Sequence, residues 1–280
     1  MSLEKDQLEQ YSGDGFILLP EHFTPLEVDI MRRELPAIFD EDSLSRVTEK
    51  DGHIVRSVYG SHATNEVFRK LTQHPRVVEP ARQILQSEVY IYQFKINAKV
   101  AFEGDLWQWH QDYIFWRKED GMPSDRVINV LIFLDEVNEF NGPLFLIPKS
   151  HREGMIDVIP QDELENGKAG KQDAYKDSPS WISNLTADLK YSLSKETVRR
   201  LAARNGLVAP KGPAGSVLFF HGNLMHGSAN NISPFDRMVI IITYNSTENI
   251  PIAVGKLRPD FLVGSYQGPI VALSDDVLLS

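Results

Sequence analysis

The chain changes character at Val89. Beyond it, short apolar runs rich in Val, Ile, Phe and Tyr alternate with stretches of Gly, Pro, Asn and Asp. Such runs are typical of β-strands joined by turns, and no full helical pattern separates one run from the next, as a doubly wound α/β sheet would require. The sequence therefore predicts a mainly β jelly-roll barrel or sandwich with flanking helices. Strands are expected within residues 89–100, 107–115, 127–134, 144–147, 216–220 and 238–244.

The first 88 residues are patterned mostly as helices, after a short apolar strand at 16–19. Thr24-Pro25-Leu26-Glu27 combines a capping Thr, a Pro at the first helical position and a Glu three residues after the cap. This combination predicts a helix start, and we expect the helix to continue to residue 39. Further helices are expected at 65–73 and 75–85. We interpret residues 1–88 as a helical support for barrel strands in 89–151 and 212–250, all within one domain of 280 residues.

Between residues 152 and 211 the strand pattern stops. Residues 161–180 are polar and rich in Lys, Asp and Gly, and a helix is expected at 194–204 with Ser194 as its cap. Long excursions of this kind commonly serve as lids or substrate loops. We therefore interpret 152–211 as a lid or insert over the barrel.

Composition limits the classes of partner. The chain has 29 basic and 39 acidic residues, a net charge of −10, which disfavours nonspecific nucleic-acid binding because that needs a basic surface. It has no cysteine, so disulfides and thiolate metal sites are excluded. No apolar run approaches the roughly 20 residues of a membrane span, and the first residues lack the apolar core of a signal peptide. We expect a cytoplasmic protein, monomeric or homodimeric, whose partner is a small molecule.

Two histidines and one carboxylate suggest a metal centre. His110 and Asp112 are separated by one residue, and His226 follows a later strand. Residues at i and i+2 of a strand share a face, so an expected strand at 107–115 would place the first two side by side. Two imidazoles and one carboxylate on one face of a metal are typical of non-haem Fe(II) oxygenases. His221 is the alternative third ligand; otherwise we expect it to line the pocket or to cap the strand.

Cationic and aromatic residues suggest what lies beside the metal. Arg237 comes eleven residues after His226 and opens an apolar strand. A guanidinium buried there needs an anionic partner, and a dicarboxylate would supply two parallel hydrogen-bond acceptors. Trp116 offers a flat face to a cationic substrate nitrogen. Lys95 or Arg126 would bind a substrate carboxylate if its side chain points inward.

Several longer motifs surround these residues. They are Gly15-Phe16-Ile17, Tyr92-Gln93-Phe94-Lys95-Ile96-Asn97, Trp107-Gln108-Trp109-His110-Gln111-Asp112-Tyr113, Glu119-Asp120-Gly121-Met122-Pro123, Asn141-Gly142-Pro143-Leu144, Ile147-Pro148-Lys149-Ser150-His151 and Asn223-Leu224-Met225-His226-Gly227-Ser228. Over nearly its whole length the chain resembles the phytanoyl-CoA dioxygenase family of Fe(II)/2-oxoglutarate oxygenases, most of all its ectoine hydroxylases.

The resemblance implies a fold, a reaction and a set of site residues. The fold is a double-stranded β-helix, which is a jelly-roll barrel. The cofactors are Fe(II), the cosubstrate 2-oxoglutarate and O₂. The reaction is hydroxylation of an unactivated C–H bond of a small zwitterion, with release of succinate and CO₂. The implied iron ligands are His110, Asp112 and His226; the implied 2-oxoglutarate contacts are Arg237, Gln93, Asn97 and Ser228; and Trp116 is implied to line the substrate pocket.

Other reactions and functions stay open. The carboxylate of Asp112 favours hydroxylation over halogenation, whereas desaturation and cyclisation use the same ligand set. Departures from ectoine hydroxylases around Phe220-His221-Gly222 and Ile114-Phe115 make a free amino acid or a natural-product intermediate as suitable a substrate as an ectoine-like compound. A non-catalytic binding or sensing barrel and a 2-oxoglutarate-independent cupin-type metal enzyme are the alternatives, and Arg237 and Gln93 weigh against the second.

Overall fold

The structure is a computed structural model that describes all residues except 1, 157, 159–180, 182–184, 187–188 and 256–257. Much of the lid expected at 152–211, including nearly all of residues 157–188, therefore lies outside the described residues. The helix expected within it is present: α8 (Lys195–Asn205) begins after Ser194, whose side chain accepts a hydrogen bond from the amide of Thr197. No helix among the described residues is long and apolar enough to cross a membrane.

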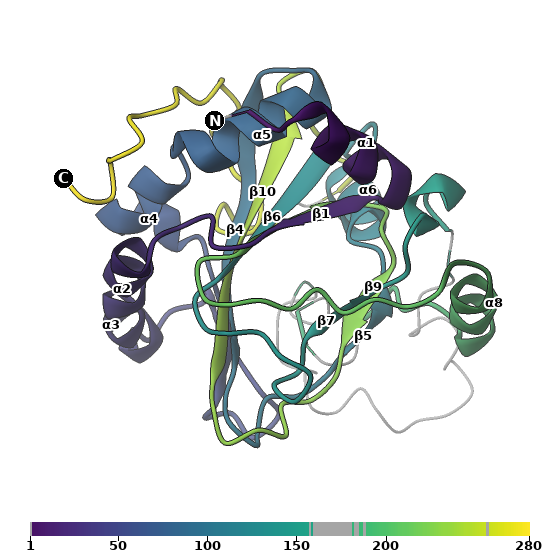
Figure 1. The fold of residues 1–280 in the computed structure, drawn as a ribbon, viewed down its shortest axis with the longest axis horizontal. Coiled ribbons are helices and arrows are strands. Elements are labelled where there is room, and N and C mark those ends of the chain that lie inside the picture. Colours follow the sequence, from purple (N-terminus) through teal and green to yellow (C-terminus); the bar gives the residue numbers. More distant parts are fainter. Residues whose placement is uncertain (1, 157, 159–180, 182–184, 187–188, 256–257) are drawn as a thin grey trace.

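Two antiparallel sheets build the barrel (Figure 1). The larger sheet has seven strands, which in spatial order are β1 (Phe16–Leu19), β8 (Val217–His221), β6 (Val127–Phe133), β10 (Arg237–Ser246), β4 (Val89–Lys99), β3 (Val55–Tyr59) and β2 (Arg46–Thr48). The smaller sheet has the order β5 (Trp107–His110), β9 (His226–Ser228) and β7 (Leu144–Leu146). This arrangement confirms the predicted jelly-roll fold.

The large sheet is covered on both faces. Along β10, Ile240 and Ile242 belong to the core that the outer helices cover, whereas Val239 and Ile241 belong to a second core inside the barrel. Successive side chains of a strand point to opposite faces. A strand buried on both faces has a near-continuous apolar sequence, which explains why β10 contains no polar residue between its first residue and Thr243.

Helices α1 (Lys5–Asp14), α2 (Pro25–Arg33), α3 (Leu35–Asp40), α4 (Glu66–Leu71) and α5 (Pro75–Leu85) lie along the outer face of the large sheet (Figure 1). The capping box of Thr24 and Glu27 starts α2 as predicted. The expectation of one unbroken helix to residue 39 is wrong, because α2 ends at Arg33 and α3 begins at Leu35. Pro36 explains the break, since proline has no amide hydrogen to bond the preceding turn and is favoured in the first turn of a helix.

The strand expected at 107–115 is also shorter than predicted. β5 ends at His110, and Tyr113 begins helix α6 (Tyr113–Asp120). Asp112 has helical backbone angles, φ −70° and ψ −38°. The run from Tyr113 to Trp116 is buried throughout, and a short apolar run does not distinguish a strand from a buried helix. Asp112 therefore reaches the barrel interior from the start of a helix and not from a strand face.

Candidate metal centre

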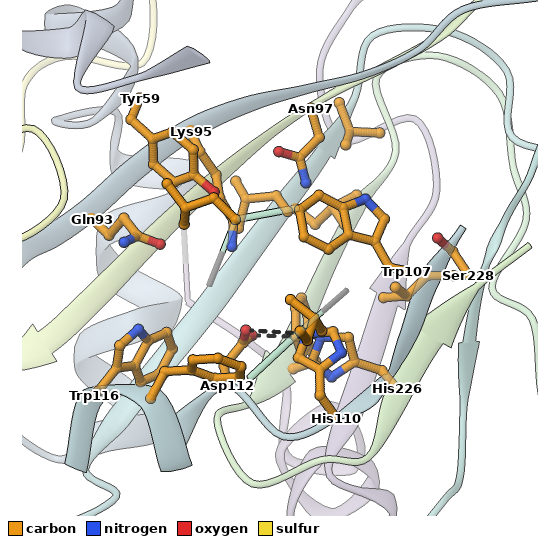
Figure 2. Close-up of a pocket in the computed structure, with 18 of the residues that line it drawn as sticks. Tyr59, Gln93, Lys95, Asn97, Trp107, His110, Asp112, Trp116, His226 and Ser228 are labelled. Carbon is orange, nitrogen blue, oxygen red and sulfur yellow. Dashed lines mark ion pairs between the residues drawn. The ribbon is translucent and has the colours of Figure 1, made fainter. Parts of the chain in front are cut away.

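His110, Asp112 and His226 converge inside the barrel (Figure 2). His110 ends β5 and His226 begins β9, where the two are paired across the sheet. The Nε2 atom of each histidine lies 3.6 Å from a different carboxylate oxygen of Asp112. Across the described part of the chain, this is the one group of histidine and acidic side chains whose ligand atoms all lie within 4.8 Å of one another. These three side chains can hold one divalent metal ion.

Backbone carbonyls orient both imidazoles. The Nδ1 atom of His110 is 2.6 Å from the carbonyl oxygen of Gln108, and that of His226 is 2.9 Å from the carbonyl oxygen of Leu224. A carbonyl oxygen only accepts, so each Nδ1 carries the hydrogen. The lone pair then lies on Nε2, the atom that faces the carboxylate, which is the usual arrangement of metal-binding histidines.

The protonation states also suit a metal site. The pKa of His226 is lowered to about 4, mainly by burial. The neighbouring His110 also lowers this pKa, and its effect is larger than the opposite effect of Asp112. Burial alone would raise the pKa of the Asp112 carboxyl, but its electrostatic interactions with His226, Lys95 and His110 hold it below its ordinary value. At neutral pH the centre thus has a carboxylate and a neutral imidazole, the forms that bind metal.

A buried amide supports the carboxylate. The Nδ2 of Asn129, on β6, donates to Oδ2 of Asp112 at 2.8 Å, and the hydroxyl of Thr243, on β10, donates to Oδ1 of Asn129 at 2.8 Å. Asn129 and Thr243 are fully buried. The sequence analysis missed both residues, because a single polar residue within an apolar strand does not reveal which side chain it faces.

Arg237 lines the pocket that contains the three convergent side chains. Its side chain is buried, and burial lowers its pKa to about 10. Its guanidinium donates to the carbonyl of Gly142 at 2.8 Å. Gly142 has φ +70°, and a Cβ there would lie 2.6 Å from the carbonyl oxygen of Ala229, so the turn requires glycine. No carboxylate among the described residues pairs with this guanidinium.

Two polar groups near Arg237 are buried without a hydrogen-bond partner in the described part of the chain. They are Oδ1 of Asn97, on β4, and Oγ of Ser228, on β9. Both residues line the pocket together with Arg237 and the three convergent side chains. The Arg237 guanidinium and the Ser228 hydroxyl can both donate to a carboxylate bound there, whereas Oδ1 of Asn97 only accepts and pairs with a donor. This donor set therefore fits a dicarboxylate that reaches from Arg237 to the metal.

Gln93, Lys95 and Trp116 line the same pocket. Gln93 and Lys95 point from β4 toward Asp112, and Trp116 lies beside Asp112 on α6 (Figure 2). The Nε2 of Gln93 donates to the carbonyl of Leu262 at 2.9 Å. The structure thus brings these three predicted residues to the pocket.

Arg126 and His221 do not line the pocket, so the substrate-binding role considered for Arg126 and the ligand and pocket-lining roles considered for His221 are wrong. His221 lies at the end of β8, in agreement with its alternative role as a strand cap. Arg126 is partly exposed and pairs with Glu248 at 2.5 Å. The Nδ1 of His221 accepts the amide hydrogen of Asn223 at 3.0 Å, and its ring lies 5.3 Å from that of His151. Neither residue lines the pocket. Arg126 does not reach the pocket because it follows a surface turn. His221 does not reach it because it ends β8 outside the barrel cavity.

Arg258 and Tyr59 are pocket residues that the sequence analysis missed. Arg258 is buried, and its Nε donates to Oδ1 of Asp120 at 2.7 Å. Tyr92 donates its hydroxyl to the same carboxylate. Arg258 follows the last strand in a segment without periodic patterning, so no signal in the sequence pointed to it. Its partner Asp120 does lie within a motif that carried the family resemblance.

Comparison with known proteins agrees with this geometry. The family model described as phytanoyl-CoA dioxygenase (PhyH) matches residues 11–239. An L-proline trans-4-hydroxylase from Streptomyces griseoviridis is 37% identical over 98% of this chain and 97% of its own length. An ectoine dioxygenase from Bordetella bronchiseptica is 35% identical over 89% of this chain and 77% of its own length.

A solved structure is similar throughout. The crystal structure of EctD from S. alaskensis with 2-oxoglutarate and 5-hydroxyectoine has a TM-score of 0.79 and 30% sequence identity, covering 97% of this chain and 87% of that chain. The predicted fold, enzyme class and cofactors are confirmed. The chain belongs to the phytanoyl-CoA dioxygenase family and is an iron- and 2-oxoglutarate-dependent dioxygenase.

Proposed function

We propose that this chain hydroxylates a small cyclic zwitterion, with L-proline and ectoine as the first candidates. One observation carries the proposal: a buried trio of two imidazoles and a carboxylate shares a pocket with a buried guanidinium that has no carboxylate partner among the described side chains. That pairing suits an iron ion and a dicarboxylate cosubstrate bound side by side.

Within this proposal His110, Asp112 and His226 hold Fe(II). Arg237 pairs with the distal carboxylate of 2-oxoglutarate, and Ser228 and Asn97 offer polar contacts along its length. Bound Fe(II) and 2-oxoglutarate together activate O₂ for attack on a C–H bond, with succinate and CO₂ as coproducts. The protein fixes the position of each reactant and surrounds it with buried side chains.

The substrate is assigned to the side of the pocket opposite Arg237. Lys95 and Arg258 both line the pocket. Lys95 supplies positive charge for a substrate carboxylate, while the charge of Arg258 is paired with Asp120. Trp116 and Phe115 supply apolar walls for a ring, and the indole face attracts a cationic nitrogen. Gln93 adds a neutral hydrogen-bonding group. A carboxylate and a ring nitrogen on one compact molecule match this combination.

The similar proteins support the same class of substrate. The relative from Streptomyces griseoviridis is named for L-proline and the one from Bordetella bronchiseptica for ectoine. Both named substrates are small rings that carry a carboxylate and a charged nitrogen group. Because the proline hydroxylase matches almost the whole of both chains, L-proline is the first compound to test.

Succinate release tests the proposal directly. The purified protein is supplied with Fe(II), 2-oxoglutarate and O₂, and succinate is measured with L-proline, pipecolate, ectoine and other free amino acids, while mass spectrometry detects a gain of one oxygen in the product. We expect one or a few of these compounds to stimulate succinate release. An Asp112→Ala variant is the matched control and should release none. If a compound binds but no succinate is released in its presence or absence, the protein would instead be a non-catalytic binding barrel.

Two properties complete the proposal. We propose that the protein acts in the cytoplasm, and that it is a monomer or a homodimer. Light scattering coupled to size-exclusion chromatography distinguishes the two from each other, and a larger assembly would overturn the second statement.

A further inference from the structure

Arg56 lies directly behind one wall of the pocket. It is on β3, its side chain is 1% exposed, and its Cζ lies 3.7 Å from the centroid of the Trp107 ring. Trp107 lines the pocket, whereas Arg56 does not. The indole therefore separates the guanidinium of Arg56 from the pocket.

Glu49 holds Arg56 in this position. The Nη1 of Arg56 donates to both carboxylate oxygens of Glu49, at 3.1 and 2.9 Å, and its Nη2 donates to the carbonyl of Leu106 at 2.8 Å. Glu49 also accepts the amide hydrogen of Asp105 at 3.1 Å. The ion pair is thus bonded to the backbone of both residues that immediately precede Trp107.

The orientation of Arg56 has a cost. Its Nε is buried and has no hydrogen-bond partner in the described part of the chain. A buried donor without a partner destabilises a fold, and a guanidinium turned toward a nearby carbonyl would avoid this. The plane of Arg56 is instead set by its contact with Trp107 and its pairing with Glu49. The contact with the indole is therefore a specific feature of this ion pair.

Trp107 lies at the cosubstrate end of the pocket. It is paired with Ser228 across β5 and β9, and its indole extends between Asn97 and Ser228 (Figure 2). These two polar residues flank the position assigned above to 2-oxoglutarate. A change in the tilt of the indole would change the width of the space between them.

We propose that Arg56, held by Glu49, is a positioning residue that keeps Trp107 against the cosubstrate, so that 2-oxoglutarate affinity depends on an ion pair that does not touch it. The inference rests on the proposed function, because it assumes that 2-oxoglutarate binds beside Trp107. Iron affinity depends on His110, Asp112 and His226 and should not respond to the same change.

Binding measurements on Arg56→Met, Arg56→Lys, Trp107→Leu and the Arg56→Met/Trp107→Leu double variant test this inference. Anaerobic titration of the Fe(II)-loaded protein with 2-oxoglutarate gives its dissociation constant from the visible charge-transfer band. Hydrogen exchange of the amides of residues 105–110 reports the order of the wall without any turnover. Iron affinity and the melting temperature are recorded for each variant as controls.

Arg56→Met should weaken 2-oxoglutarate binding about tenfold, speed amide exchange at residues 105–110, and leave the iron dissociation constant within about twofold of wild type. Arg56→Lys should give a smaller loss, since an ammonium keeps the charge but lacks the planar fork. If Arg56 acts through the indole, the double variant should bind 2-oxoglutarate no more weakly than Trp107→Leu alone.

Multiplicative losses in the double variant, or an unchanged affinity in Arg56→Met, would overturn the inference. If Arg56→Met does not fold, the comparison of Arg56→Lys with Arg56→Lys/Trp107→Leu applies the same criterion. If the wild-type protein binds Fe(II) but gives no charge-transfer band with 2-oxoglutarate, the proposed function itself is wrong. If the wild-type protein gives the band and the Arg56 variants bind 2-oxoglutarate equally well, only the role of Arg56 is wrong.

Discussion

Asn129 donates a hydrogen bond from its Nδ2 to Oδ2 of Asp112, with a length of 2.8 Å. The two residues come from different elements, β6 and the start of α6. Asp112 lies beyond the end of β5, so it has no backbone pairing partner on an adjacent strand. The amide of Asn129 therefore fixes the orientation of a carboxylate that a short turn alone would leave loosely defined.

Asn129→Leu should weaken iron binding by about 10- to 100-fold, the usual effect of removing a group that orients a metal ligand. Leucine has a similar size, so the packing of β6 should largely persist. Competition with a chelator of known affinity measures the iron dissociation constant. Thr243→Val is the matched control: it removes only the hydroxyl that holds Asn129 and should cause a smaller loss. Equal iron affinity in wild type and Asn129→Leu would show that Asp112 does not need this support.

Arg237→Gln should raise the dissociation constant for 2-oxoglutarate by about 100-fold, since it removes a charge-assisted, two-fold hydrogen bond. The iron dissociation constant should change little. Anaerobic titration of the charge-transfer band measures the first quantity and chelator competition the second. Arg237→Lys keeps the charge and should recover part of the affinity. Unchanged 2-oxoglutarate binding in the glutamine variant would place the cosubstrate elsewhere.

Lys95→Met should raise the apparent KM for the zwitterionic substrate about tenfold or more, because it removes a charge from the side of the pocket assigned to the substrate carboxylate. Methionine preserves most of the length of the side chain. The substrate-independent release of succinate should persist, since that reaction needs no substrate carboxylate. Steady-state succinate assays with and without substrate separate the two effects. A loss confined to the 2-oxoglutarate KM would assign Lys95 to the cosubstrate instead.

His74 should make the fold sensitive to acid. It caps α5: its Nδ1 accepts the amide hydrogen of Arg76 at 3.2 Å, and its Nε2 lies 3.1 Å from the carbonyl oxygen of Asp275. Burial and then the charge of Arg76 lower its pKa from 6.5 to about 4. The unfolded chain then binds more protons than the folded chain between these two values, so the free energy of unfolding falls as pH drops from 6.5 toward 4.

The size of this loss should be on the order of 2 kcal/mol. Urea unfolding of the metal-free protein across this pH range measures it. His74→Asn is the matched variant, because asparagine also caps helices and does not titrate. It should lose less stability than wild type over the same interval. Parallel pH profiles for the two proteins would mean that His74 does not set the acid sensitivity.

Much of the architecture was predictable from local patterns. The apolar strands 127–134 and 238–244 and the capped starts at Thr24 and Ser194 are properties of neighbouring residues, and the structure has elements at each of these places. The errors occurred where a local pattern is ambiguous. Pro36 divides an otherwise helical stretch, and the apolar run after Asp112 suits a strand as well as a helix.

The site was predictable only in part. Two histidines and a carboxylate are recognisable as residue types, so their convergence in the structure agrees with the expectation even though the argument from a shared strand face was wrong for Asp112. Asn129, Tyr59 and Arg258 depend on which elements pack together across the barrel. That information is tertiary, and no spacing along the chain contains it.

A single strand, β10, begins with Arg237 and contains Thr243, which supports Asp112 through Asn129. A slip of β10 by one residue would turn both side chains away from the cavity together. Trp116 and Arg258, by contrast, come from a helix and from the segment after the last strand. Because these two proposed substrate contacts lie outside β10, directed evolution for new substrates should succeed most readily when it targets positions 116 and 258 and leaves the central strand and Asp112 untouched.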